Sequence, residues 1–378
     1  MNVLILGASS STQGRTHFSN AVGYNLAIGF KNIGCKTFMI EGTDYFFAEG
    51  LNIIPRKAFD EKKMKEMHLI IFTRENYIKR FIMEFPFLGI ALKEMERKET
   101  FPIFAFRFGK PGWYKEFFQS PSSFYYSTGI LLPQTFGIAK AFINILPNGD
   151  DMKKVWVSPM GVPSSIPPKP KHNPFPKTDK VNLVYMGRLR HSPSREGFIM
   201  KVMSLLEEFR LYIFPGSFSI GTSSKKYNPL IEEEDFSLLK KLFAPAKNIF
   251  IMNPVPYGEH WGYLQWADLG FDLTPSFNRR GNGGGNAKLL ENMRAGLPTV
   301  TEIGITNPTV GTQVDGVVFA KNANSPESYA NAVRKASSRV WNRNYIALGT
   351  TMMESYERRA AEIIDNIGMT TGINLWGI

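Results

Sequence analysis

Residues 281–300 read GNGGGNAKLLENMRAGLPTV, a glycine-rich turn followed by a predicted helix over 286–295 and a strand over 299–301. Glycine permits positive φ and a close approach of the backbone to a ligand. Backbone N–H groups at a helix N-terminus bind anions such as a diphosphate, because the helix dipole lies behind them. Glu291, about 1.5 turns into the helix, is within reach of such a ligand, and its carboxylate can accept both hydroxyls of a ribose. A glycine-rich string alone is equally typical of a flexible surface loop.

The sequence on both sides of this stretch alternates between strand and helix patterns, which is typical of parallel α/β sheets. In the C-terminal half we expect strands over 181–186, 211–214, 249–251 and 269–273, and helices over 196–209, 235–243 and 259–266. In the N-terminal half we expect strands over 2–8, 36–40, 67–72, 102–106 and 154–158, and helices over 17–33 and 135–145. Two further helices are predicted over 326–338 and 346–367.

A proline-rich segment separates the two halves. Residues 163–180 contain six prolines and no apolar periodicity, which is linker composition. The chain length of 378 residues also favours two domains. We therefore predict an N-terminal domain over 1–162, a linker over 163–180 and a C-terminal domain over 181–353.

Asn286 to Val300 resembles the donor-binding signature of retaining GT-B glycosyltransferases, in particular family 4. Other landmarks of that family follow in the same order; they are Pro159-Met160-Gly161-Val162, Val184-Tyr185-Met186-Gly187-Arg188-Leu189, Ala267-Asp268 through Thr274-Pro275-Ser276, and Tyr356-Glu357-Arg358-Arg359-Ala360. The resemblance covers most of the chain, is specific in the C-terminal half, and is only architectural before residue 155. It implies two Rossmann-like domains that face a cleft, with residues from about 354 to 378 crossing back to the N-terminal domain.

The resemblance also implies a donor site for a nucleotide-diphosphate sugar, linked to UDP or GDP. Glu291 would hold the donor ribose, and Arg188 and Arg195 would neutralise the leaving diphosphate without a metal. These three are the candidate catalytic residues. The loop 252–256 would flank the base, and the turn and helix start would contact the diphosphate and the sugar. The remaining candidate donor-binding residues are Gly14, Pro254, Val255, Gly284, Gly285, Asn286, Ala287, Lys288 and Leu290. The loop around Gly14 has an alternative interpretation as a variable surface loop.

Two positions depart from the family pattern. The family often has a glutamate where this chain has Gly283, which leaves the identity of the donor sugar open. Many relatives carry a sugar-contacting histidine after a mid-domain strand. The corresponding region here, 106–110, contains no histidine, and Arg107 or Lys110 is the residue there that would face the cleft.

The composition excludes several other classes of protein. One cysteine, Cys35, rules out an internal disulfide framework and a cysteine-rich zinc site, and it fits a reducing compartment. The five histidines are scattered, and no Asp-x-Asp, Gly-x-Ser-x-Gly or Walker motif occurs, so we expect no metal requirement. No apolar run approaches the ~20 residues that a membrane-spanning helix needs. We therefore expect a cytoplasmic protein.

Positive charge is concentrated in one part of the sequence. The formal net charge is +12, and residues 51–200 hold 24 lysines and arginines against 13 acidic residues. Such a band attracts polyanions, although a solvated basic face is the simpler interpretation. The basic band, together with the aromatic residues between 113 and 126, favours a glycan or lipid-linked glycan acceptor at an anionic membrane surface. The same features are also compatible with an acceptor DNA that carries a hydroxylated base. A non-enzymatic polyanion-binding protein on a degenerate GT-B scaffold is the alternative function.

Overall fold

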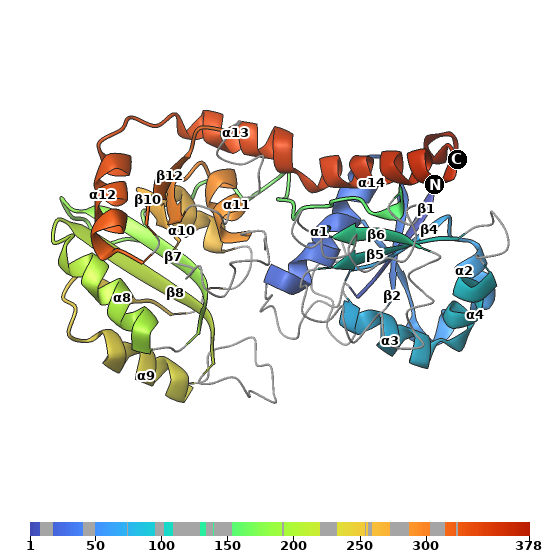
Figure 1. The fold of residues 1–378 in the computed structure, drawn as a ribbon, viewed down its shortest axis with the longest axis horizontal. Coiled ribbons are helices and arrows are strands. Elements are labelled where there is room, and N and C mark those ends of the chain that lie inside the picture. Colours follow the sequence, from blue (N-terminus) through green and yellow to red (C-terminus); the bar gives the residue numbers. More distant parts are fainter. Residues whose placement is uncertain are drawn as a thin grey trace.

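The computed structural model describes residues 1–7, 18–40, 50–73, 75–94, 102–108, 129–133, 139, 153–190, 193–219, 233–253, 255, 259–272, 287–302, 314–322 and 324–378. These residues form two six-stranded parallel sheets, each in its own lobe (Figure 1). None of the described helices is long and apolar enough to cross a membrane.

The first sheet has the strand order β3-β2-β1-β4-β5-β6. Its strands are β1 (Asn2–Leu6), β2 (Lys36–Ile40), β3 (Asn52–Ile54), β4 (Leu69–Phe72), β5 (Ile103–Phe108) and β6 (Ile130–Pro133). The described helices between these strands are α1 (Phe18–Asn32), α2 (Glu61–Lys65), α3 (Glu75–Glu84) and α4 (Pro86–Glu94). The central strands are apolar on both faces because helices cover both sides of a parallel sheet.

The second sheet has the strand order β12-β11-β10-β7-β8-β9. Its strands are β7 (Val181–Arg190), β8 (Phe209–Ser219), β9 (Ile249–Ile251), β10 (Leu269–Phe271), β11 (Thr299–Glu302) and β12 (Val317–Ala320). The helices of this lobe are α8 (Pro193–Ser204), α9 (Glu233–Phe243), α10 (His260–Trp266), α11 (Ala287–Arg294) and α12 (Pro326–Ser337).

The C-terminal helices α13 (Arg343–Glu354) and α14 (Tyr356–Thr371) run from the second lobe to the first, where α14 lies beside α1 (Figure 1). Ile363, Ile364 and Ile367 of α14 are buried in the same cluster as Val3 and Ile5 of β1. The predicted return of the chain to the N-terminal half is therefore confirmed.

The prediction of one continuous helix over 346–367 is wrong. Ser355 has extended backbone angles (φ −66°, ψ 154°), which end α13 and begin α14. The Ser355 hydroxyl accepts a hydrogen bond from the Arg358 N–H and so caps α14. The two helices are thus separate units joined at one residue.

The proline-rich segment 163–180 has no helix or strand, as its composition predicts, but it is packed against the second lobe. Phe175 is buried against Tyr212 and Tyr263, with ring centroids 4.7 and 6.0 Å away. The Trp266 indole of α10 donates to the Pro170 carbonyl at 2.9 Å. This segment is therefore anchored to α10 rather than free.

The edge of the first sheet differs from the prediction. Residues 154–158 form a single β-bridge, between Val155 and Leu131, and not a full strand. The edge strand beside them is β6, which the sequence pattern did not indicate. The predicted helix over 135–145 lies almost entirely outside the described residues.

Candidate functional site

The strand order of the second sheet marks where a ligand can bind. The chain enters the sheet at β7, adds β8 and β9 on one side, and then places β10, β11 and β12 on the other. In open parallel sheets, ligands bind outside the carboxyl ends of the strands where this order reverses. Here that point lies between β7 and β10, and α11, the next described element after β10, begins with the candidate residues Ala287 and Lys288.

Lys288 lies across the end of β7. Its ammonium donates to the Tyr185 hydroxyl at 2.6 Å and lies 4.2 Å from the centroid of the Tyr185 ring. Gly187 makes room for this side chain, because a Cβ there would be 2.6 Å from Lys288 Cε. Gly187 also has φ +118°, in the region that favours glycine. The end of β7 is thus shaped to hold a cation at the first turn of α11.

Glu291 is a buried carboxyl group one turn further along α11. Burial raises its pKa to about 8, although nearby Lys288 acts in the opposite direction. Its Oε1 lies 3.7 Å from His260 Nε2 and has no hydrogen-bond partner among the described residues. Burial lowers the pKa of His260 to about 3, so the two groups face each other mostly uncharged at pH 7.

The structure places the other candidates as follows. The Leu290 side chain is buried in the core with Leu289 and Met293, so only its backbone could serve a ligand. The Val255 side chain packs on the cluster that contains Trp261.

Arg188 lies in β7 just beyond Gly187, and Arg195 lies in the first turn of α8; of both, only the backbone is described. Ala287 is the first residue of α11, again with its backbone alone described. The remaining candidates lie outside the described residues; they are Gly14, Pro254, Gly284, Gly285 and Asn286.

The segments that join the two lobes pair with each other close to α11. The Val162 N–H donates to the Glu354 carbonyl at 2.8 Å, and the Tyr356 N–H donates to the Val162 carbonyl at 3.0 Å. Arg294, the last residue of α11, donates to the carbonyls of Pro163 and Ser164, the first at 2.8 Å. Helix α11 is therefore bonded directly to the junction between the lobes.

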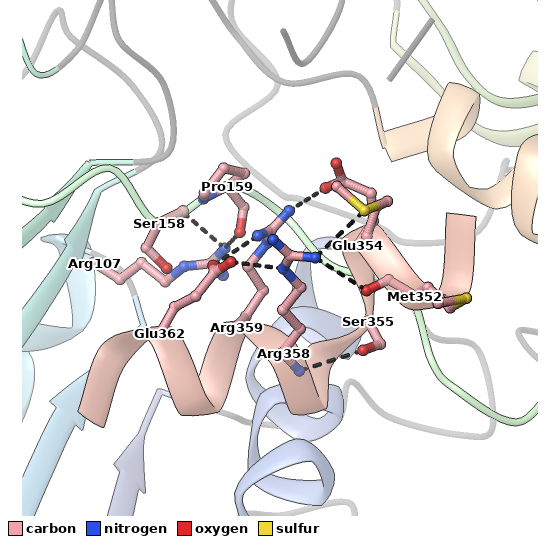
Figure 2. A network of polar contacts seen from close by, with 10 residues as sticks. Arg107, Ser158, Pro159, Met352, Glu354, Ser355, Arg358, Arg359 and Glu362 are labelled. Atoms are coloured by element: carbon pink, nitrogen blue, oxygen red, sulfur yellow. Dashed lines mark hydrogen bonds and ion pairs between the residues drawn. The ribbon is translucent and has the colours of Figure 1, made fainter. Parts of the chain in front are cut away.

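A polar network lies under this junction (Figure 2). The Arg359 guanidinium of α14 forms ion pairs with Glu354 and Glu362. Arg107 of β5 reaches the same place and donates to the carbonyls of Pro159 at 2.7 Å and Ser158 at 3.3 Å. The sequence pattern did not indicate this network, because its members come from distant parts of the chain.

Two groups near Glu291 were also not predicted. His260 is one of five scattered histidines, and only its place at the start of α10, after the candidate base loop, could have suggested a role. The Tyr356 hydroxyl is buried beside the Gly161 backbone and lies within electrostatic reach of both Glu291 and Arg107. Across the described residues, no cluster of three or more histidine, cysteine or acidic side chains is placed to hold a metal ion.

No protein-family model and no curated protein matches the chain, but solved structures match it along its whole length. A sucrose-phosphate synthase from Thermosynechococcus elongatus is 11% identical, with a TM-score of 0.56 over 98% of this chain and 96% of that one. The Anabaena protein HepE, solved with UDP-glucose, is 11% identical, with a TM-score of 0.54 over 100% of both chains. A UDP-GlcNAc 2-epimerase from Methanocaldococcus jannaschii is 14% identical, with a TM-score of 0.51 over 96% of this chain and 99% of that one.

These likenesses show the fold. The chain has the GT-B glycosyltransferase fold, with two Rossmann-like parallel sheets and a C-terminal helix that returns to the first of them. A synthase and an epimerase both resemble it, so the activity must be argued from the site rather than from the fold.

Proposed function

We propose that this protein is a glycosyltransferase that moves a sugar from a nucleotide-diphosphate donor to an acceptor. The observation that carries the proposal is the start of α11 at the switch point of the second sheet, with Lys288 in its first turn and the buried carboxyl group of Glu291 in the next. Helix N–H groups and a cation suit a diphosphate, and a carboxyl group suits the hydroxyls of a ribose. In this proposal the donor half is 181–353, the linker is 163–180, and the acceptor half is 1–162 with 354–378.

The proposed donor is a UDP-sugar, with a GDP-sugar as the second choice. HepE, which shares the fold, was solved with UDP and with UDP-glucose. In the proposed mechanism Arg188, Arg195 and the start of α11 stabilise the leaving diphosphate without a metal. The leaving phosphate deprotonates the acceptor, and the anomeric configuration is retained.

The proposed acceptor is a glycan or a lipid-linked glycan, with the basic band of residues 51–200 near an anionic membrane surface in the cytoplasm. DNA with a hydroxylated base is the alternative acceptor, and polyanion binding without catalysis is the alternative function. Co-sedimentation with anionic liposomes supports the lipid-linked acceptor, whereas DNA binding that weakens steeply with salt supports the nucleic acid.

The test is a panel of UDP- and GDP-sugars in which the release of free nucleoside diphosphate is measured. We expect release with at least one donor, and protection of the protein from thermal unfolding by the matching nucleoside diphosphate. Conversion of UDP-GlcNAc to its 2-epimer without an acceptor would instead indicate an epimerase. If no nucleoside diphosphate protects the protein and none is released, the polyanion-binding alternative is favoured.

The donor-site assignment is tested with Glu291→Ala. We expect an affinity for the donor about tenfold lower or worse, because each lost hydrogen bond to a ligand hydroxyl costs about 1 kcal/mol. The far-UV circular dichroism should be unchanged. Glu207→Ala, at an exposed turn before β8, is the control and should bind donor normally. Transfer at the parental rate by the Glu291 variant would contradict the assignment.

A further inference from the structure

Arg107 is an unusual buried cation at the carboxyl end of β5. Its side chain extends from the first sheet toward α14 and ends beside Arg359 (Figure 2). Only 1% of the residue is exposed. One nitrogen, Nη2, donates to the carbonyls of Ser158 and Pro159. The two hydrogen bonds of Nη2 therefore fix the position of the Arg107 guanidinium.

The other two nitrogens of that guanidinium, Nε and Nη1, are also buried. Neither Nε nor Nη1 has a hydrogen-bond partner within the part of the chain that the structure describes. The carboxylates of the network, Glu354 and Glu362, are paired with Arg359 instead. Arg107 is thus a buried cation with two carbonyl contacts and, among the described residues, no counter-ion.

The positive charge of Arg107 determines which kind of group can bind beside its Nε and Nη1. A water molecule could accept from the free N–H groups, but it would not offset a buried charge, which costs several kcal/mol when it is unpaired. Burial lowers the pKa of Arg107 only to about 10, so the group remains a cation at neutral pH. An oxyanion would satisfy both the free N–H groups and the charge, and guanidinium groups bind carboxylate and phosphate well.

The place of Arg107 connects it with the donor site. The buried Tyr356 hydroxyl lies within electrostatic reach of both the Arg107 guanidinium and the Glu291 carboxyl group. Burial raises the pKa of that hydroxyl above its usual range, against a smaller opposite effect of the Gly161 backbone, so the hydroxyl stays protonated and can donate a hydrogen bond. Buried side chains from β5, α14 and α11 thus interact electrostatically near the junction of the lobes.

We infer that Arg107, assisted by the Tyr356 hydroxyl, binds an oxyanion that a sugar substrate carries, either the carboxylate of an acidic donor sugar or a phosphate on the acceptor. The inference rests on the proposed sugar transfer and narrows its substrates. The protein then prefers an acidic substrate to the neutral counterpart of the same shape, and this preference depends on Arg107.

Calorimetric binding to two matched pairs of probes tests the inference. The first pair is UDP-glucuronate and UDP-glucose, and the second is glucose 6-phosphate and glucose in the presence of UDP. We expect the acidic member of one pair to bind at least about tenfold more tightly, a difference of about 1.4 kcal/mol. The pair that shows the preference identifies whether the donor or the acceptor carries the oxyanion. Arg107→Met should abolish the preference, and Arg334→Met, on the exposed face of α12, should leave it intact.

Two measurements keep the result interpretable. Arg107→Lys retains a cation with fewer directed N–H groups, so it should show an intermediate preference. The affinity for UDP alone and the far-UV circular dichroism of each variant report whether the fold is intact. Equal binding of the two members of both pairs, or a preference that survives in Arg107→Met, would overturn the inference. In either case, binding of UDP would still support the proposed function. If the wild-type protein binds neither UDP nor GDP, the proposed function falls, and this inference falls with it.

Discussion

Burial has a larger effect on the pKa of the Glu291 carboxyl group than the neighbouring Lys288 ammonium does. Its pKa is raised to about 8, above the ordinary value of 4.5. The unfolded chain therefore ionises at a lower pH than the native protein does. The native protein favours the neutral acid, so the stability that this group contributes is complete below about pH 4.5 and is lost as the pH rises through 8.

Glu291→Gln tests this assignment of charge. The amide cannot ionise, so we expect the variant to have a higher Tm than the wild type at pH 8.5, by at least about 2 °C, and no advantage at pH 5. Thermal unfolding followed by circular dichroism at both pH values measures the difference. Glu207→Gln, at an exposed turn, should show no such pH dependence. An equal Tm difference at both pH values would show that the carboxyl group is ionised in the native protein.

Gly187 is a second residue on which the geometry of the candidate site depends. Gly187→Ala should cost about 1–3 kcal/mol of unfolding free energy, because alanine is strained at φ +118° and its Cβ meets the Lys288 side chain. The variant should also bind nucleoside diphosphate more weakly, since Lys288 must leave Tyr185. The measurements are urea denaturation and calorimetry.

Gly197→Ala is the matched control for Gly187→Ala. Gly197 lies in α8, and a Cβ there would meet nothing within 4 Å. We expect that change to be neutral or to stabilise the protein by up to about 1 kcal/mol, because alanine favours helix. If the two alanine variants behaved alike, the shaped end of β7 would have no energetic role.

At the scale of elements, the end of α11 depends on Gly296. This glycine has φ +73°, and a Cβ there would lie 2.5 Å from the backbone oxygen of Arg343. Gly372, after α14, has φ +72° and nothing within 4 Å of the same position. The two sites therefore share the backbone conformation and differ only in crowding.

We expect Gly372→Ala to cost about 1 kcal/mol, which is the strain of alanine in the left-handed region. Gly296→Ala should cost clearly more, because α11 and α13 must move apart. Urea denaturation of both variants measures the difference in unfolding free energy. Equal losses would mean that the contact between the Gly296 turn and Arg343 adjusts freely.

Local signals explain which elements could be predicted. Helix α11 was predicted within one residue at each end, because glycine-rich sequence precedes it and Gly296-Leu297-Pro298 ends it. The break at Ser355 was missed because the residues on both sides continue a helical pattern, while the break itself depends on hydrogen bonds to Val162. Strand β6 was missed because it has only four residues and includes Pro133, a residue type that counts against a strand.

The same limit applies to the candidate site. Lys288 and Glu291 could be found because both lie on one helix beside a glycine-rich turn. His260 and Tyr185 could not, because their roles depend on side chains far away in the sequence that only the packed sheets bring close. Arg107 could be named from the sequence, but its contacts with residues 158 and 159 could not. Spacing along the chain carries no information about such contacts.

At the scale of the whole molecule, the two connections between the lobes form one joint. The chain crosses once near Val162 and returns at Ser355, and these positions pair in a parallel β-bridge. Asn32 of α1 and Ser164 both donate to the Glu357 carboxylate, at 2.6 and 2.5 Å. A movement of one lobe relative to the other must therefore disturb both crossings, and with them the contacts that Arg294 of α11 makes.

The return of α14 makes the first lobe depend on the end of the chain. Three isoleucines of α14 are buried in its core, and burying each contributes about 1.5–3 kcal/mol. Their sum is comparable with the total stability of a typical domain, about 5–15 kcal/mol. The main apolar cluster of the second lobe contains no residue of α14. The two lobes should therefore respond differently to the loss of this helix.

A chain that ends at Glu354 tests this dependence. We expect amide hydrogens of β1 and β4 to exchange rapidly with solvent, because their core is opened, while those of β7 and β10 remain protected. Hydrogen exchange read by mass spectrometry measures both sheets in one sample. A chain that ends at Gly372 keeps α14 and should protect both sheets. If β1 and β4 were equally protected in the two chains, the first sheet would be stable without α14, and the C-terminal helix would serve to connect the lobes rather than to complete one of them.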